Sequence, residues 1–356
     1  KKPILTKEYH EILENPEIDA VIIMTGWGSH IKIAVDSLLA GKYTAIEVGG
    51  AYDISECYEL VNAYEKTGAP LMMLENCCYG RKELMALNMV KQGLFGEIVH
   101  CAGGYMHYLT KGELLDRENN DINHYRLNEY LNRNCENYPT HELGPISKVL
   151  GINRGNKMLT LTSTASKACG IKEYIKENHP DSKYVNADFK QGDIVVTNIK
   201  CANGELITLT LDTTLPRPYY SRAFTVRGTK GGYFEERRVV YFEGMEDELK
   251  FNEEEFFEKY DHPLHEEYSK LGSRGGHSGM DWLVCRAFVE SVKRGIQTPI
   301  DAYDTAAWMA VTPLSEQSIA MGGTPVPVPD FTKGRWSHRE PIAEGKYCLD
   351  KICVDK

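Results

Sequence analysis

Short apolar runs alternate with amphipathic segments over the first 76 residues of the chain. The runs 19–25, 43–48 and 70–74 are short and almost wholly apolar, which is typical of strands buried on both faces. Between them, residues 30–40 and 53–66 carry apolar side chains at helical spacing. Such alternation predicts a parallel sheet whose strands are joined by right-handed helical crossovers.

A different pattern follows this N-terminal part. A long strand is expected over residues 98–108, and residues 157–243 contain five segments of strand character joined by glycine-containing turns. Helices are expected over 83–92, 142–150, 253–270, 279–294 and 302–321, and residues 109–137 are expected to form an irregular excursion. We therefore predict an α/β chain in two parts: residues 1–80 with a parallel sheet, and residues 81–356 as an α+β domain with a large, mainly antiparallel sheet.

Composition narrows the class of protein. The chain has 356 residues, 42% of them hydrophobic and 26% charged, which is typical of a globular protein with about two domains. Its net charge of −10 disfavours nucleic acid as a partner. No apolar run is long enough for a membrane span, so no membrane association is expected. The ten cysteines form no C-x-x-C pair and are interpreted as reduced thiols of a cytoplasmic protein.

Polar residues follow each of the three predicted parallel strands. The loop Gly26-Trp-Gly-Ser-His30 joins the first strand to a helix N-terminus, Glu47 ends the second strand, and Glu75-Asn76 follow the third. Ligands of open α/β sheets bind at this carboxyl edge, and a helix N-terminus suits a phosphate. The loop lacks the third glycine of a dinucleotide fingerprint, so an ordinary turn between strand and helix remains the alternative.

The segment Asn137-Tyr-Pro-Thr-His141 carries the clearest candidate chemistry. Tyr138 and His141 stand three residues apart at the start of a predicted helix, so both rings can face the same way. A phenol and an imidazole in this arrangement form an acid/base pair suited to hydroxyl chemistry. The alternative is an ordinary helix cap at Thr140 or Asn137 with His141 exposed to solvent.

Other candidates are weaker. The neighbours Cys77-Cys78 are interpreted as small buried residues rather than a redox pair. His262-x-x-His265 lies in an acidic segment, expected to be exposed, and lacks a third ligand, so no metal site is predicted. The loop 275–281 is interpreted either as a ligand loop or as a glycine-rich helix entry.

Several motifs in combination resemble the glucose–fructose oxidoreductase/inositol dehydrogenase (Gfo/Idh/MocA) family. They are Thr25-Gly-Trp-Gly-Ser-His30, Ala40-Gly-Lys42 and Glu47-Val-Gly49. The runs Met73-Leu-Glu-Asn76, Tyr138-Pro-Thr-His141 and Pro216-Arg-Pro-Tyr-Tyr-Ser-Arg222 are most similar to its branch called glycoside hydrolase family 109. The resemblance implies that residues 1–80 are the C-terminal part of a Rossmann-like dinucleotide-binding domain, and that residues 81–356 bind substrate and form oligomers. It also implies that a glycine-rich first unit precedes this chain, so the Rossmann sheet is expected to be N-terminally incomplete.

The resemblance assigns roles to particular positions. Cofactor contacts are implied for Trp27, Gly28, Ser29, His30, Glu47, Val48, Asn76 and Tyr138. Substrate contacts are implied for Tyr105, Arg126, Tyr138, His141 and Tyr220, with Tyr219 as the alternative to Tyr220. The implied catalytic residues are His141, Tyr138, Tyr105 and Glu75.

The chemistry implied by the family is hydride abstraction by NAD from a sugar carbon, expected at C3. NADP is the alternative cofactor. Elimination and water addition would then give glycoside hydrolysis without net redox change. Two alternatives remain: a simple sugar or polyol dehydrogenase, and a non-catalytic subunit that pairs with a full-length partner. A homodimer or homotetramer is expected.

Overall fold

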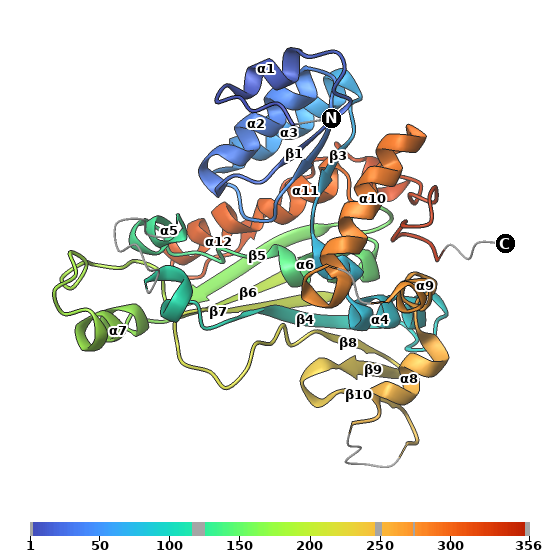
Figure 1. Ribbon diagram of the computed structural model, residues 1–356. Coiled ribbons are helices and arrows are strands. Elements are labelled where there is room, and N and C mark those ends of the chain that lie inside the picture. The colour runs from blue at the N-terminus through green and yellow to red at the C-terminus, as the bar shows by residue number, and fades with distance from the viewer. Residues whose placement is uncertain (1–2, 116–124, 246–250, 273–274, 353–356) are drawn as a thin grey trace.

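The computed structural model describes residues 3–115, 125–245, 251–272 and 275–352. Two sheets lie one above the other, with helices between them (Figure 1). The smaller sheet has the parallel order β1-β2-β3, formed by Ala20–Ile23, Tyr43–Ile46 and Leu71–Met73. The predicted parallel sheet is therefore confirmed. Among the described residues, β1 pairs only with β2.

The larger sheet has the order β10-β9-β8-β4-β7-β6-β5-β11, and all its pairs are antiparallel except β4 with β7. This confirms the predicted α/β fold with a large, mainly antiparallel second sheet. Its strands are β4 (Ile98–Met106), β5 (Met158–Ala165), β6 (Ile194–Cys201), β7 (Leu206–Asp212), β8 (Thr225–Gly228), β9 (Gly231–Phe234), β10 (Val239–Phe242) and β11 (Val326–Pro327).

Helices cover the small sheet and fill the space between the two sheets (Figure 1). α6 packs on β4, α12 packs on β5, and α11 packs on both α3 and β3. C-terminal helices thus return to the N-terminal sheet, and the division at residue 80 stays a prediction. The helices are α1 (Tyr9–Glu14), α2 (Trp27–Leu39), α3 (Ile54–Thr67), α4 (Arg81–Lys91), α5 (Arg126–Asn132), α6 (Thr140–Leu150), α7 (Gly170–Asn178), α8 (Glu253–Tyr260), α9 (Pro263–Leu271), α10 (Met280–Arg294), α11 (Ala302–Met309) and α12 (Val311–Ala320).

Two helix predictions and the predicted irregular excursion differ from the structure. The segment 302–321 forms two helices that meet at Ala310, and Pro313 near the start of α12 cannot donate a backbone hydrogen bond. The segment 253–270 is likewise divided, because Pro263 begins α9. The predicted irregular excursion contains the short helix α5, while residues 116–124 of it lie outside the described residues.

One face of the large sheet packs on the helices, and the other remains half-exposed. Along β7, the buried residues Ile207, Leu209 and Leu211 alternate with partly exposed Thr208 and Thr210. This period of two is typical of a sheet with one face in the core. No helix among the described residues combines the length and apolar character needed to cross a bilayer.

Candidate active site

The carboxyl ends of the three parallel strands meet above the large sheet. The indole Nε1 of Trp27 donates to the Val48 carbonyl at 3.0 Å, which joins the ends of β1 and β2. The Leu74 amide donates to the Ile46 carbonyl at 2.8 Å, which joins β2 and β3. Trp27, Glu47, Val48 and Glu75 therefore lie on one edge, as the strand pattern predicts.

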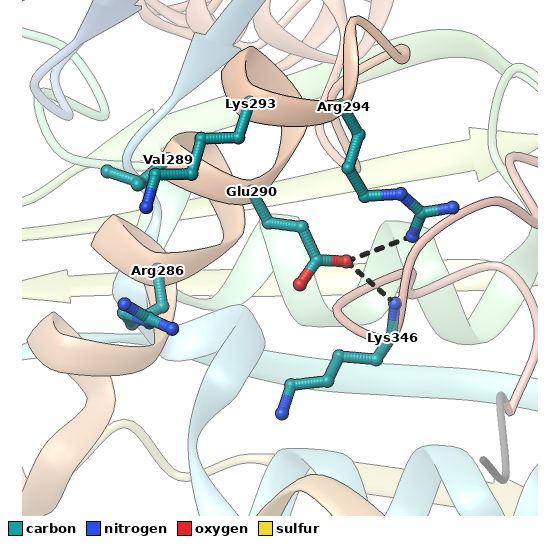
Figure 2. Close-up of a pocket in the computed structure, with 6 residues that line it drawn as sticks. All are labelled: Arg286, Val289, Glu290, Lys293, Arg294 and Lys346. Atoms are coloured by element: carbon teal, nitrogen blue, oxygen red, sulfur yellow. Dashed lines mark hydrogen bonds and ion pairs between the residues drawn. The ribbon is translucent and has the colours of Figure 1, made fainter.

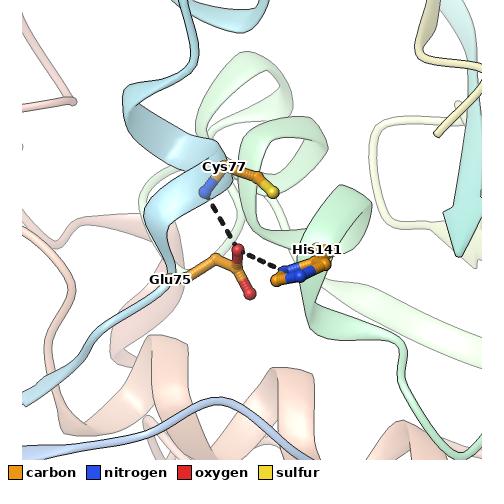
Figure 3. A group of neighbouring side chains, drawn as sticks. All are labelled: Glu75, Cys77 and His141. Carbon is orange, nitrogen blue, oxygen red and sulfur yellow. Dashed lines mark hydrogen bonds and ion pairs between the residues drawn. The ribbon is translucent and has the colours of Figure 1, made fainter. Parts of the chain in front are cut away.

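His141 and Glu75 form the central polar contact of this edge. Nδ1 of His141 lies 2.8 Å from Oε1 of Glu75 (Figure 3). The Cys77 amide donates to the same carboxylate oxygen at 3.1 Å. Burial alone would raise the pKa of Glu75, but the His141 imidazole and the Cys77 amide outweigh burial and hold that pKa below its usual value. Glu75 is therefore an anion that can fix one imidazole nitrogen and stabilise a positive charge on the ring.

Aromatic rings surround this pair. The ring centroid of Tyr138 lies 4.7 Å from that of His141, 4.4 Å from Tyr105 and 5.7 Å from Trp27. The guanidinium of Arg126 lies 4.8 Å from the Tyr138 ring centroid. Burial raises the pKa of both tyrosine phenols, so they stay protonated near neutral pH and act as hydrogen-bond donors. The His141 side chain is only 13% exposed, so the alternative in which Thr140 or Asn137 caps the helix and leaves His141 exposed is wrong.

Tyr220, in the segment between β7 and β8, completes the group. Its ring centroid lies 6.1 Å from that of Tyr105. Tyr219 is more exposed, and its carbonyl and ring contact the Arg217 guanidinium instead. The structure thus brings all the predicted substrate-site residues together from β4, α5, the start of α6 and the segment before β8. It favours Tyr220 over Tyr219 as the member of the doubled pair near this site.

The remaining predicted cofactor positions surround the start of α2. Gly26 caps this 13-residue helix without a side-chain hydrogen bond, so the first backbone N–H groups are not capped by a side chain. Ser29 is exposed, and Gly28 faces the Tyr52 ring. His30 is fully buried, and its two ring nitrogens have no hydrogen-bond partner among the described residues. Burial lowers the pKa of His30 to about 4, so the ring is neutral. These features fit a polar ligand at the helix N-terminus.

Glu47 and Asn76 lie on the other side of this edge. Burial, followed by the charges of Glu75 and Asp281, raises the pKa of Glu47. Asn76 donates from Nδ2 to Oδ1 of Asp281 at 2.6 Å. The strand ends thus bring a set of carboxylates close to the place where the resemblance expects nicotinamide.

One group of side chains among the described residues is close enough to hold a metal ion. The candidate ligand atoms of Glu75, Cys77 and His141 lie within 4.8 Å of one another (Figure 3). The Glu75–His141 hydrogen bond and the adjacency of Cys77 in sequence already account for this proximity. Nη1 of Arg222 lies 3.4 Å from the Cys77 sulfur, and a fixed cation there opposes a second positive charge. The prediction of no metal stays a prediction.

Known proteins are similar to most of this chain. The family model for the C-terminal domain of glycosyl hydrolase 109 matches residues 79–338. The chain is 40% identical to an alpha-N-acetylgalactosaminidase of Tannerella forsythia, over 94% of this chain and 75% of the relative. It is also 40% identical to a family 109 protein of Parabacteroides distasonis, over 94% of this chain and 76% of that protein.

The chain belongs to glycoside hydrolase family 109. The resemblance to this family and the prediction that the chain is an enzyme are therefore confirmed. Solved structures share the fold at low identity. An NAD binding oxidoreductase from Klebsiella pneumoniae has a TM-score of 0.69 at 17% identity and covers 91% of this chain and 83% of its own. A levoglucosan dehydrogenase in complex with NADH and levoglucosan has a TM-score of 0.66 at 17% identity, with 91% and 84% covered.

The structure adds two side chains to the family 109 site that the sequence did not single out. His107 lies 3.0 Å from the Tyr105 hydroxyl through Nδ1, and its ring centroid is 5.2 Å from that of Tyr220. His107 follows the end of β4, and in the predicted strand 98–108 its spacing of two from Tyr105 places both on one face, so this signal could have identified it. The second is Arg222, which is buried between Glu83 and Glu142, with its Nε 2.8 Å from Oε1 of Glu142. Only the tertiary fold brings these three charges together.

The interpretation of His262 and His265 as an exposed pair is wrong. Both side chains are buried. His262 caps α9 by accepting from the Leu264 amide, and Nε2 of His265 lies 2.9 Å from the Tyr79 carbonyl. Packing and capping therefore explain these residues.

Proposed function

We propose that this chain acts on a glycoside, with an α-linked N-acetylgalactosamine as the first substrate to test, by oxidation at C3, elimination of the aglycone, addition of water and reduction. The relatives named alpha-N-acetylgalactosaminidase support the substrate class. The structural neighbours that contain NADH support the cofactor. The observation that carries the proposal is the Glu75–His141 pair, set against two protonated tyrosines at the carboxyl edge of a Rossmann-type sheet.

The cofactor would be held by the α2 N-terminus with Trp27, Val48 and Asn76. Bound there, oxidised nicotinamide would supply the hydride acceptor. NADP is the alternative to NAD, because the described residues include no side chain assigned to the adenosine ribose.

Proton transfer is the part of the chemistry assigned to the chain itself. A sugar hydroxyl is a very weak acid, so its oxidation needs a base at the oxygen. Glu75 holds Nδ1 of His141, which leaves Nε2 of that ring to take the hydroxyl proton. Tyr105 and Tyr138 cannot serve as the base while burial keeps them protonated, so we assign them to hold the sugar oxygen by donated hydrogen bonds.

The later steps balance without a further reactant except water. A ketone at C3 acidifies the neighbouring C2–H bond, and loss of that proton expels the protonated aglycone from C1. Water then adds its hydroxyl to C1 and a proton to C2, and return of the hydride to C3 and of the proton to the C3 oxygen restores the hydroxyl. The sum is hydrolysis with no net consumption of oxidant.

The test uses p-nitrophenyl α-N-acetylgalactosaminide with NAD⁺ below the substrate concentration. We expect many nitrophenol molecules per NAD⁺ in the wild type, and about 10² to 10⁴ times slower release in His141→Ala. The exposed His338 provides the matched control His338→Ala, which should retain the wild-type rate. Stoichiometric NADH accumulation without nitrophenol release would identify a simple dehydrogenase instead. Wild-type activity in His141→Ala would refute the assigned base.

A further inference from the structure

The turn that leads into α10 has an unusual backbone. His277 and Ser278 are consecutive non-glycine residues whose backbone lies in the left-handed region, at φ +49° and +57°. Gly279 follows at φ +97°, where a Cβ would overlap the Tyr268 ring. Strained non-glycine residues persist only where the surrounding structure fixes them, and such positions cluster at functional sites. This turn fixes the position of the first turn of α10.

Asp281, in that first turn, reaches the end of β3. Its Oδ1 accepts a hydrogen bond from Nδ2 of Asn76 at 2.6 Å, and its Oδ2 lies 2.8 Å from Nδ1 of His277. The Asp281 side chain is 40% exposed and that of His277 is 69% exposed, so the pair lies at the rim of the protein surface. Asn76 itself stands next to Glu75. Asp281 therefore connects the protein surface with the candidate active site.

Three carboxylates, those of Glu47, Glu75 and Asp281, lie near one another at this edge of the sheet. The charges of Glu75 and Asp281 both raise the pKa of Glu47, after the larger effect of burial, which indicates that the three groups interact. Glu75 is paired with His141, and Asp281 is paired with His277. An oxidised nicotinamide ring is positively charged, whereas the reduced ring is neutral. A carboxylate near the ring therefore stabilises the oxidised form more than the reduced form.

We propose that Asp281 is a positioning residue of the cofactor site: it fixes the Asn76 amide, and its charge favours oxidised over reduced nicotinamide. The inference rests on the proposed function, which assigns Asn76 to the cofactor. It gives Asp281 a role that the first step of the reaction requires, because turnover begins with the oxidised cofactor.

The variant Asp281→Asn separates charge from shape. Its side-chain oxygen can still accept from Asn76, but the negative charge is lost. We expect the Kd for NAD⁺ to rise about three- to tenfold while the Kd for NADH changes less than twofold. Both constants are measured by direct titration of the full chain, following protein and NADH fluorescence. Asp281→Ala also removes the acceptor for Asn76, so both affinities should weaken.

A matched control lies on the same helix. Glu290→Gln removes the same charge about 13 Å further along α10. There Glu290 contacts Arg294 and the Lys346 amide, beside a cavity of about 310 Å³ that is also lined by Arg286, Val289 and Lys293 (Figure 2). This control should leave the ratio of the two affinities unchanged.

The outcomes distinguish the inference from the function on which it rests. An unchanged NAD⁺/NADH affinity ratio in Asp281→Asn would overturn the inference, even if the melting temperature fell, because a purely structural role predicts that result. If the wild type bound neither form of the cofactor, the proposed function itself would fail and the inference with it.

Discussion

Glu136 is a buried carboxyl group immediately before the Asn137-Tyr138 segment. Its side chain is 1% exposed, and its backbone is held by α12 through hydrogen bonds with Ser315 and Thr312, each 2.8 Å long. Burial raises the pKa of Glu136 to about 8, and the Tyr138 amide offsets this only in part. In the described part of the chain, no cation compensates its charge. The folded protein therefore prefers the protonated carboxyl.

This preference makes stability depend on pH. The pKa of the unfolded state is 4.5, so the difference of about 3.5 corresponds to about 5 kcal/mol, at roughly 1.4 kcal/mol per pH unit. Because the folded pKa is raised, the contribution is fully present below pH 4.5. It decreases as the unfolded state ionises, and it is lost once the pH has risen through about 8.

Glu136→Gln tests this reasoning with a neutral side chain of the same shape. We expect the free energy of unfolding of the variant, relative to wild type, to increase by about 3 kcal/mol between pH 5 and pH 8. Urea unfolding at several pH values measures it. The exposed Glu258 provides the control Glu258→Gln, whose difference from wild type should vary little with pH. A difference for Glu136→Gln that stays constant within about 0.5 kcal/mol would refute a buried, protonated Glu136.

Three further predictions concern packing, charge and assembly. Gly49→Ala, at φ +151°, places a Cβ against the Trp27 indole. We expect the free energy of unfolding, measured by thermal unfolding, to fall by about 2 kcal/mol or more, and the affinity for nicotinamide to weaken. Arg222→Met leaves two buried glutamates without their cation, so the free energy of unfolding in urea should fall by about 3–5 kcal/mol. This loss should be smaller at pH 5 than at pH 8, because the carboxyls protonate at the lower pH. If the half-exposed face of the large sheet pairs two copies of the chain, Thr210→Arg should lower the molecular mass measured by light scattering. A wild-type monomer at micromolar concentration would contradict the expected oligomer.

The sequence was most informative where its signals are local. The short runs 19–25, 43–48 and 70–74 located the parallel strands, and Asp53, a residue type favoured at helix starts, caps α3 by accepting from the Ser55 and Glu56 amides. The spacing of three between Tyr138 and His141 predicted rings on one side, and their centroids lie 4.7 Å apart. Each of these features depends on neighbours within one turn or one strand.

Contacts between distant residues could not be read in this way. Glu75 and His141 are 66 positions apart, and Asn76 and Asp281 are 205 positions apart. Their meeting depends on how α6 and α10 pack against the end of β3, which no local pattern specifies. The resemblance to a family supplied the first pair but not the second.

Burial agrees with the division of roles between the two rings. From the sequence, Tyr138 and His141 form an acid/base pair in which the phenol is expected to relay a proton and hold the oxygen, and the imidazole to act as the base. In the structure, Tyr138 is buried among Tyr105, Trp27 and Arg126, and burial keeps its phenol protonated despite the nearby cation. His141 instead contacts the ionised Glu75 carboxylate, with Nδ1 2.8 Å from Oε1. This arrangement supports the proposal that the imidazole is the base, since the Glu75 carboxylate can stabilise the positive ring that forms when it takes a proton.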